Sequence, residues 1–295
     1  MLSKIYNLLN YCYEDSIMDR YAGIEFQLFL LSTKTLLPYE NKIGCMVDLN
    51  RYKNELDLFA YYKNGNDDTI NYYLSNKKQS NSEDNLMEYK IIPIAISNTD
   101  FNVLIEEVLK TVMFYTLNKN TILNAVILSS VIYEYFEIDT VDLDNLKNKT
   151  NARLIDFSFK EFIENNNMTQ MDKSYIIGFE KERIKMIASG NCISDELLMK
   201  YKAIRHIVNN VKAVKPINKE NEVILSNFAA YILKLRKGTV APEKLKYSNE
   251  EYHDFKEYLK HSNFTHPLLG KCIVMKRNTN EIILKNKLGL LKVNI

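Results

Sequence analysis

Carboxylates beside hydroxyl groups are the side chains of this 295-residue chain whose types and spacing could do chemistry. They occur in three clusters: Glu14-Asp15-Ser16, Asp67-Asp68-Thr69 and Glu137-Ile138-Asp139-Thr140. Hard cations such as Mg²⁺ take oxygen ligands of this kind. Two clusters at neighbouring helix starts could form a dinuclear site and activate water for hydrolysis. The structural alternative is helix capping, because Asp, Ser and Thr are favoured at helix starts and each cluster adjoins a predicted helix.

Histidine and cysteine provide no recognisable catalytic or metal-binding motif. The four histidines form no H-E-x-x-H pattern, and no cysteine lies at zinc-finger spacing from them. No C-x-x-C pair occurs either, so we expect the cysteines to be buried free thiols in a reducing cytosol. The P-loop, G-x-G-x-x-G and G-x-S-x-G patterns are absent as well. These residues are His206, His253, His261, His266, Cys12, Cys45, Cys192 and Cys272.

The segment from Lys271 onward is basic, with six Lys and Arg residues against one acidic residue, Glu281. A small basic β unit can hold nucleic acid through its phosphates. However, aliphatic residues alternate with the lysines, and no aromatic platform for stacking bases is evident. The structural alternative is a solvated strand face whose lysines also protect a sheet edge. The basic residues are Lys271, Lys276, Arg277, Lys285, Lys287 and Lys292.

Helices are the elements that must position these side chains. Eight Gly and five Pro are few for this length, which favours helices over a many-stranded β fold. With 46% hydrophobic and 26% charged residues, the chain can bury a sizeable core. Apolar periodicity and capping residues predict the helices. Their expected ranges are 2–12, 16–37, 48–62, 67–74, 100–113, 121–136, 157–164, 173–189, 194–211, 220–237 and 248–259.

The stretch from Lys90 to Phe136 is the predicted centre of the fold. An apolar run, 91–96, is followed by a polar break and two apolar helices. The second of these helices begins at Thr121 and is apolar on nearly every face, as expected for a helix surrounded by others. We therefore expect a mainly α fold, an orthogonal helical bundle closed by a small C-terminal antiparallel β segment.

The predicted organisation is a helical domain over residues 1–265, with an internal boundary near the polar stretch 139–150, and a β extension over 266–295. Alternating apolar residues from Gly270 predict two or three strands, with a turn at Asn278-Thr279-Asn280. No apolar run reaches the roughly 18 residues of a membrane span, and no signal-peptide core is present. The net charge of +2 gives no whole-chain case for nucleic-acid or membrane binding. We expect a cytoplasmic protein.

The central stretch carries an ordered series of segments. Asp84-Asn85-Leu86-Met87 and the run from Lys90 to Ala95 precede the helix from Phe101, then Tyr115-Thr116 and the apolar helix. This series resembles the ADP-ribosylglycohydrolase family, an all-helical, Mg²⁺-dependent fold. Its members carry Asn-Gly-x-x-Met-Arg-x-x-Pro-Leu, a helix, a Thr-His-like turn and an apolar helix in that order. Lys90 stands where the family has Arg.

The resemblance implies a Mg²⁺ site and an ADP-ribose-type ligand. Tyr13-Glu14-Asp15-Ser16 is similar to the family's early Thr-Asp-Asp-Thr-like cluster. On this basis Glu14, Asp15 and Ser16 would be the metal ligands, with Asp15 also catalytic. Asn85 and Lys90 would contact the ligand. The metal would polarise the ribosyl link and orient a water molecule.

Two departures from the family concern the other acidic clusters. Asp67-Asp68-Thr69 matches the early cluster in letters but lies closer to Lys90 than the family's spacing. The family's late Asp-x-Asp-Thr has its letters in Glu137-Ile138-Asp139-Thr140, which follows the apolar helix directly, and none occurs beyond Thr150. The resemblance thus implies a member that has lost part of its metal site.

Two functions stay open from the sequence. The first is an ADP-ribosylglycohydrolase-like protein that binds an ADP-ribose-type ligand with Mg²⁺; if active, it would hydrolyse N- or O-glycosyl bonds of ADP-ribose linkages. The second is a non-catalytic helical interaction protein whose basic C-terminal β unit contacts a protein or a nucleic acid.

Overall fold

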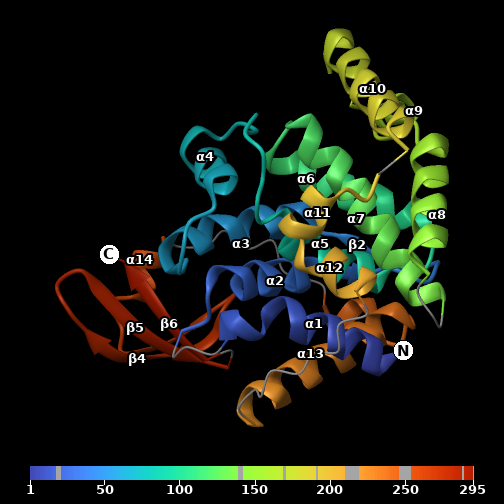
Figure 1. Ribbon diagram of the computed structural model, residues 1–295. Coiled ribbons are helices and arrows are strands. Elements are labelled where there is room, and N and C mark those ends of the chain that lie inside the picture. The colour runs from blue at the N-terminus through green and yellow to red at the C-terminus, as the bar shows by residue number, and fades with distance from the viewer. Residues whose placement is uncertain are drawn as a thin grey trace.

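Helices make up most of the computed structural model, so the predicted mainly α fold is confirmed (Figure 1). The structure describes residues 1–17, 21–138, 142–168, 171–190, 192–209, 219–245, 254–287 and 289–294. The helices are α1 (Leu2–Ile17), α2 (Ile24–Thr35), α3 (Leu49–Tyr62), α4 (Asp68–Asn76), α5 (Met87–Ser97), α6 (Phe101–Tyr115), α7 (Lys119–Glu137), α8 (Leu143–Asp156), α9 (Phe159–Asn165), α10 (Lys173–Ala188), α11 (Asp195–Lys200), α12 (Lys202–Val208), α13 (Lys219–Arg236) and α14 (Phe255–Tyr258), with a short 3₁₀ turn, η1 (Pro242–Lys244).

Helix α5 lies at the centre, and every one of its residues is buried. It packs against α2, α6, α7 and α13. Pro93 stands inside this helix and has no N–H to donate to the carbonyl of Tyr89, four residues earlier. The hydroxyl of Tyr13 on α1 donates to that carbonyl instead, at 3.3 Å. A tertiary hydrogen bond thus replaces the one that the proline removes.

The predicted break between the first two helices was wrong in position. Helix α1 continues to Ile17, and α2 begins only at Ile24, so Asp15 and Ser16 lie at a helix end rather than a start. Ser16 nevertheless caps α2 through space. Its hydroxyl accepts the N–H of Phe26 in the first turn of α2 at 3.0 Å and donates to Glu25 at 3.0 Å. Gly23 is needed beside it, because a Cβ there would lie 2.7 Å from the Ser16 hydroxyl.

Other helix boundaries follow local capping chemistry. Asp48, Asp67 and Asp100 cap α3, α4 and α6, and each stands at the start of a predicted helix range. Thr121 does not cap α7, because the Asn118 side chain accepts the Thr121 N–H and the helix starts at Lys119. The helix predicted over 194–211 divides at Tyr201 into α11 and α12. The start of the helix predicted over 248–259 lies outside the described residues, which resume at Asp254.

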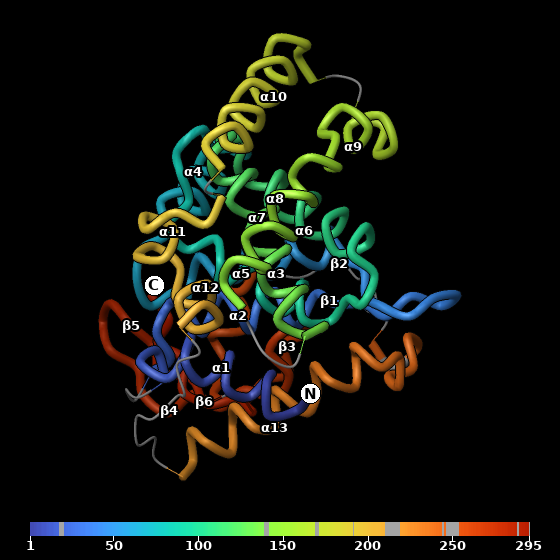
Figure 2. The backbone as a smooth tube through the Cα atoms, turned by 45° about the vertical axis from the view of Figure 1, so that its right-hand side comes forward, coloured from blue at the N-terminus to red at the C-terminus, as the bar shows by residue number. Residues whose placement is uncertain are grey.

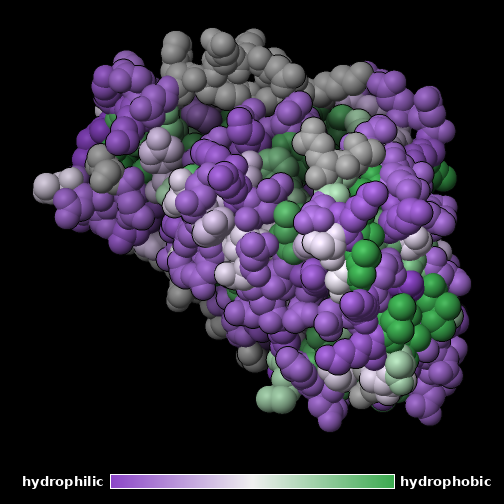
Figure 3. Space-filling view, turned by 90° about the horizontal axis from the view of Figure 1, so that it is seen from above, coloured by the Kyte–Doolittle hydropathy of each residue, from purple (hydrophilic) through white to green (hydrophobic). Residues whose placement is uncertain are grey.

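The polar stretch 139–150 is described from Asp142 onward, where it becomes the first half of α8. Asp142 caps this helix, and α8 packs against α7. Helices α9 and α10 continue from it to one end of the molecule (Figure 1). From above, this surface is mostly hydrophilic, and its hydrophobic side chains gather in a few patches (Figure 3).

A four-stranded antiparallel sheet closes the chain, in the order β3-β4-β5-β6. Its strands are β3 (Asn263–His266), β4 (Gly270–Arg277), β5 (Glu281–Asn286) and β6 (Gly289–Asn294). The predicted turn at 278–280 is confirmed, since the Asn278 N–H donates to the Glu281 carbonyl at 2.8 Å. The sheet has four strands where two or three were expected, and β3 precedes the predicted segment. The sheet projects at the end opposite α9 and α10, and β6 contacts α3 (Figures 1 and 2).

A two-stranded hairpin lies between α2 and α3, where no strand was predicted. Strands β1 (Leu36–Pro38) and β2 (Cys45–Val47) pair antiparallel, with Gly44 at φ +127° in the turn. Glu107 of α6 accepts the Val47 N–H at 2.7 Å, which fastens the hairpin to the helical body. Among the described residues, no helix combines the length and apolarity that a membrane span requires.

Candidate functional site

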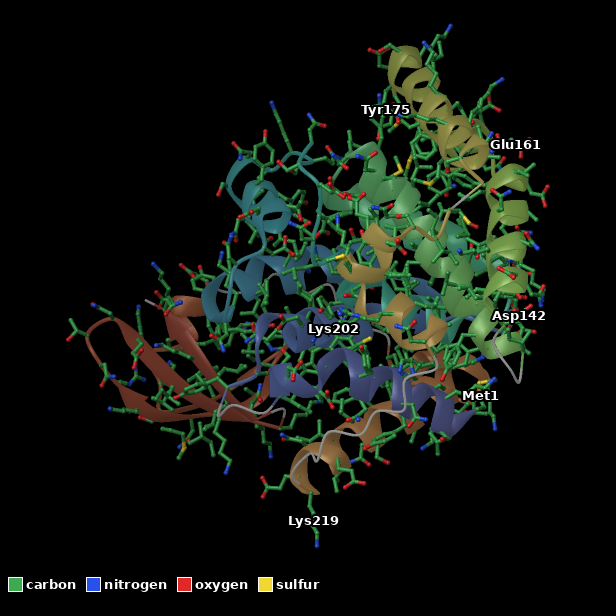
Figure 4. The ribbon with its side chains drawn as sticks, in the orientation of Figure 1. Met1, Asp142, Glu161, Tyr175, Lys202 and Lys219 are labelled. Atoms are coloured by element: carbon green, nitrogen blue, oxygen red, sulfur yellow. The ribbon has the colours of Figure 1, made fainter. Side chains whose placement is uncertain are left out.

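Asp15 and Ser16, in the acidic cluster at the end of α1, already contact other residues of the same chain. The Asp15 carboxylate lies 3.2 Å from the Lys202 ammonium at the start of α12, near the centre of Figure 4. Ser16 uses its hydroxyl on α2, as described above, and Glu14 is buried. Over the described residues, no three His, Cys, Asp or Glu side chains form a group that could hold a metal ion. Asp139 and Thr140 of the third cluster lie outside the described part.

A different acidic pair converges on Lys90. The Lys90 ammonium lies 2.6 Å from the Oδ2 atoms of both Asp67 and Asp84, and 4.4 Å from the centroid of the Tyr115 ring. Asp67 begins α4, Asp84 precedes α5, and Tyr115 ends α6. Thr121 of α7 completes the cluster by accepting the Asp84 N–H at 2.9 Å. The cluster therefore ties four helices together, and we call it the Lys90 cluster.

Solvent does not reach the Lys90 cluster. The Lys90 side chain is 0% exposed, whereas Asn85, five residues earlier, is exposed at the surface. The two residues predicted to share a ligand are therefore not on one accessible surface. The contact between Asp67 and Lys90 forms because the chain from Asp67 to Lys90 folds back on itself through α4.

Burial and the Lys90 charge shift the pKa values of the two aspartates in the Lys90 cluster in opposite directions. Burial raises the pKa of Asp67, but the Lys90 ammonium and hydrogen bonds from Ile70 and Thr69 outweigh it, so this pKa is lowered. Burial dominates at Asp84 and raises its pKa despite the Lys90 ammonium, and the Asp67 charge adds to the rise. The cluster is thus a tightly held ion pair beside a carboxyl that retains a proton more easily.

Glu88 forms a second buried polar contact that the sequence did not indicate. Its carboxylate oxygens accept the backbone N–H groups of Lys202 and Ala203 at 3.1 and 3.0 Å. Burial raises the pKa of Glu88 to about 7 in spite of these bonds. The available signal was a carboxylate close to the start of the apolar run 91–96, since a charge beside such a run is buried only when it is paired or hydrogen-bonded.

The histidines and cysteines behave as packing residues. His206 lies between the rings of Tyr11 and Tyr135, and burial lowers the pKa of His266 to about 4. His261 is exposed, and His253 lies outside the described residues. All four cysteines are buried free thiols, as predicted.

One face of the C-terminal sheet is open to solvent, and we call it the basic sheet face. Its members are Lys271, Ile273, Met275, Lys276 and Lys285. Ile273 is 49% exposed and Met275 is 57% exposed, although both belong to an inner strand. Ile273 pairs across the sheet with Lys285, and a bulge near Met275 turns the strand locally. The opposite face is buried.

Two lysines of the basic sheet face do not protect an edge. Lys271 and Lys285 lie on the inner strands β4 and β5, within the paired part of the sheet. Lys276 differs from them, because β3 pairs with β4 only as far as Ile273, so edge protection can explain Lys276 but not the other two. Lys292 on β6 is different, because it pairs with Glu281 at 2.7 Å.

No protein-family model, curated protein or solved structure matches this chain. Its function is therefore argued from its own residues, and the resemblance to ADP-ribosylglycohydrolases stays an interpretation of the sequence.

Proposed function

We propose that this protein is a non-catalytic interaction protein that docks an acidic surface of another protein on the basic sheet face. The observation that carries this proposal is the exposure of Ile273 and Met275 among lysines on an inner strand. Protein interfaces combine an apolar centre with a polar rim. Exposed apolar side chains gathered within a charged surface are typical of such sites.

Charge selects the partner. Lys271 and Lys285 have no ion-pair partner in the described part of the chain, so their charges are available to acidic groups. Complementary charge speeds encounter and excludes wrong partners. A nucleic acid fits less well, because the face has no aromatic side chain for stacking bases and phosphate binding would leave Ile273 and Met275 without a role.

The alternative is the ADP-ribosylglycohydrolase-like function with Mg²⁺ and an ADP-ribose-type ligand. The order of segments along the sequence supports it. Its metal site would require Asp15 to leave the Lys202 ammonium and Ser16 to release the Phe26 N–H. Such rearrangement weighs against it, since a preformed site binds at lower cost.

The cytoplasm is the compartment that we propose for this interaction. The four free cysteines support it, because secreted proteins ordinarily pair such residues as disulfides.

Affinity capture with variants of the basic sheet face tests the proposal. The tagged full-length chain is compared with Ile273→Ser/Met275→Ser and with Lys271→Gln/Lys285→Gln, after nuclease treatment. We expect the same captured protein to be lost with both variants. The matched control is Ile177→Ser/Ile184→Ser on α10, whose side chains are 57% and 58% exposed, and it should retain the partner.

The interaction is then measured with the purified partner. Each double variant of the basic sheet face should weaken binding by about tenfold or more, as expected for residues at an interface centre. Binding that nuclease abolishes, or that the serine substitutions leave unchanged, would assign the face to nucleic acid and overturn the proposal. Loss with the α10 control as well would overturn it too.

A further inference from the structure

A large groove lies at the opposite end of the molecule from the basic sheet face. Its volume is about 1080 Å³, and it lies between the start of α6, Tyr133 of α7, the end of α8 and helix α9. This volume is at the upper end of the range of small-ligand sites. We call it the α6–α9 groove. Figure 4 shows Glu161 at this end of the molecule, distant from Lys202.

The charge of the α6–α9 groove is negative. Four carboxylates line it against a single cation, Arg153: those of Asp100, Glu106, Asp156 and Glu161. Glu134 binds the Arg153 guanidinium from outside the lining, with a hydrogen bond of 3.1 Å to Nε. Lys149 pairs with the same Glu134 at 2.8 Å, so this carboxylate is shared between two cations, and the four lining carboxylates still outnumber Arg153.

Of these carboxylates, Asp156 alone has no evident structural task, because Glu161 stands in the first turn of α9, where the helix dipole favours an anion. Asp100 caps α6, and Glu106 pairs with Lys110. Asp156 and Glu161 are exposed, and neither has an ion-pair partner within the described ranges. Asp156 stands in the last turn of α8, where the helix dipole disfavours an anion. Helix stability therefore does not account for this aspartate.

The groove wall already holds one organic cation of the protein itself, because Arg153 lies over two of its aromatic rings. The Arg153 guanidinium lies 4.1 Å from the ring centroid of Phe101 and 4.5 Å from that of Tyr133. Phe157 and Phe162 add further aromatic surface to the lining. Aromatic faces together with carboxylates are the chemistry that recognises ammonium and guanidinium groups.

From the cavity, its charge and its aromatic lining, we infer that the α6–α9 groove binds a small aliphatic polyamine. Its ammonium groups would pair with Asp156 and Glu161, and its methylene chain would lie along the aromatic side chains. A metal ion fits less well, because among the described residues, those of the groove included, no three His, Cys, Asp or Glu side chains form a group that could hold one. This site is separate from the basic sheet face and does not depend on the function proposed for that face.

Isothermal titration of the full chain with spermidine at low salt tests the inference. We expect saturable binding, with Asp156→Asn/Glu161→Gln weakening it by about five- to tenfold, as two partly exposed ion pairs allow. The matched control, Asp144→Asn/Glu164→Gln, removes the same two charges from α8 and α9 outside the groove lining. It should bind within about twofold of the unchanged chain.

Stability provides a second readout. The single variant Asp156→Asn relieves an unfavourable contact with the α8 dipole, so it should melt no lower than the unchanged chain while binding less spermidine. Equal losses in the control, displacement of spermidine by an equal concentration of Mg²⁺, or no saturation up to about 10 mM would each overturn the inference. If oligolysine bound to the protein and spermidine did not, the polyamine assignment would be overturned.

Discussion

Glu88 is a buried acid whose pKa is raised from 4.5 to about 7, chiefly by burial. Its native form therefore holds a proton that the unfolded chain releases. The resulting stability is fully present below about pH 4.5 and is lost as the pH rises through about 7. A shift of this size corresponds to roughly 3 kcal/mol, since each pKa unit is about 1.4 kcal/mol.

Glu88→Gln should remove this component of the pH dependence. Urea denaturation between pH 4.5 and 8 measures it: the unchanged chain should lose stability toward high pH, and the variant should show a flatter profile. The exposed Glu164→Gln serves as control and should keep the original profile. An identical profile for Glu88→Gln would show that this carboxyl is not the titrating group.

Lys90→Met should destabilise the protein by about 3–5 kcal/mol, because it leaves Asp67 and Asp84 buried without their cation. The triple variant Lys90→Met/Asp67→Asn/Asp84→Asn removes the charges together and should recover much of the loss. Denaturant midpoints measure both. A cost below about 1 kcal/mol for the single variant would contradict a closed ionic cluster.

Tyr13→Phe should weaken helix α5 at its proline. The substitution leaves the buried Tyr89 carbonyl without a donor and should cost about 1–3 kcal/mol. Pro93→Ala would restore a backbone N–H to that carbonyl, so Tyr13→Phe should cost less in the Pro93→Ala background. A double-mutant cycle measures this coupling, and additive costs would contradict it.

Helix boundaries show how far sequence patterns reach. Asp48, Asp67 and Asp100 were predictable as caps because their partners lie two or three residues along the chain. Asp15 or Ser16 was expected to cap the next helix directly, whereas Ser16 caps α2 across an intervening segment that local spacing does not indicate. Thr121 was misassigned because Asn118 offers a competing side chain three residues earlier. Hydrogen bonds between residues close together in the sequence can be predicted from it, whereas those between segments that only folding brings together cannot.

The Lys90 cluster shows the same limit for the site. Lys90 was singled out, and Asp67 was noticed, but spacing gave no reason to join them. Their contact depends on the way α4 and the segment before α5 pack on α6 and α7. The basic character of the C-terminal strands was predictable by counting. Which lysines lie on inner strands depends on the order β3-β4-β5-β6 and the added first strand.

For the whole molecule, the two proposed functions predict different responses to ligand. Thermal unfolding is followed with Mg²⁺, with ADP-ribose and with both. A ligand that binds only the native state raises the melting temperature by mass action. We expect no rise, because Asp15, Ser16 and Lys90 are already engaged. A rise that requires both ligands would favour the ADP-ribosylglycohydrolase-like alternative.

The four buried thiols can report local opening of the folded structure. They lie in α1, in β2, beside α11 and in β4: Cys12, Cys45, Cys192 and Cys272. A thiol is alkylated only when its surroundings open, and different parts of a protein open with different free energies. Mass spectrometry after brief alkylation in dilute urea should therefore resolve four separate opening rates. If the C-terminal sheet is the least stable unit, Cys272 will be alkylated first, and no cysteine has to be introduced for this measurement.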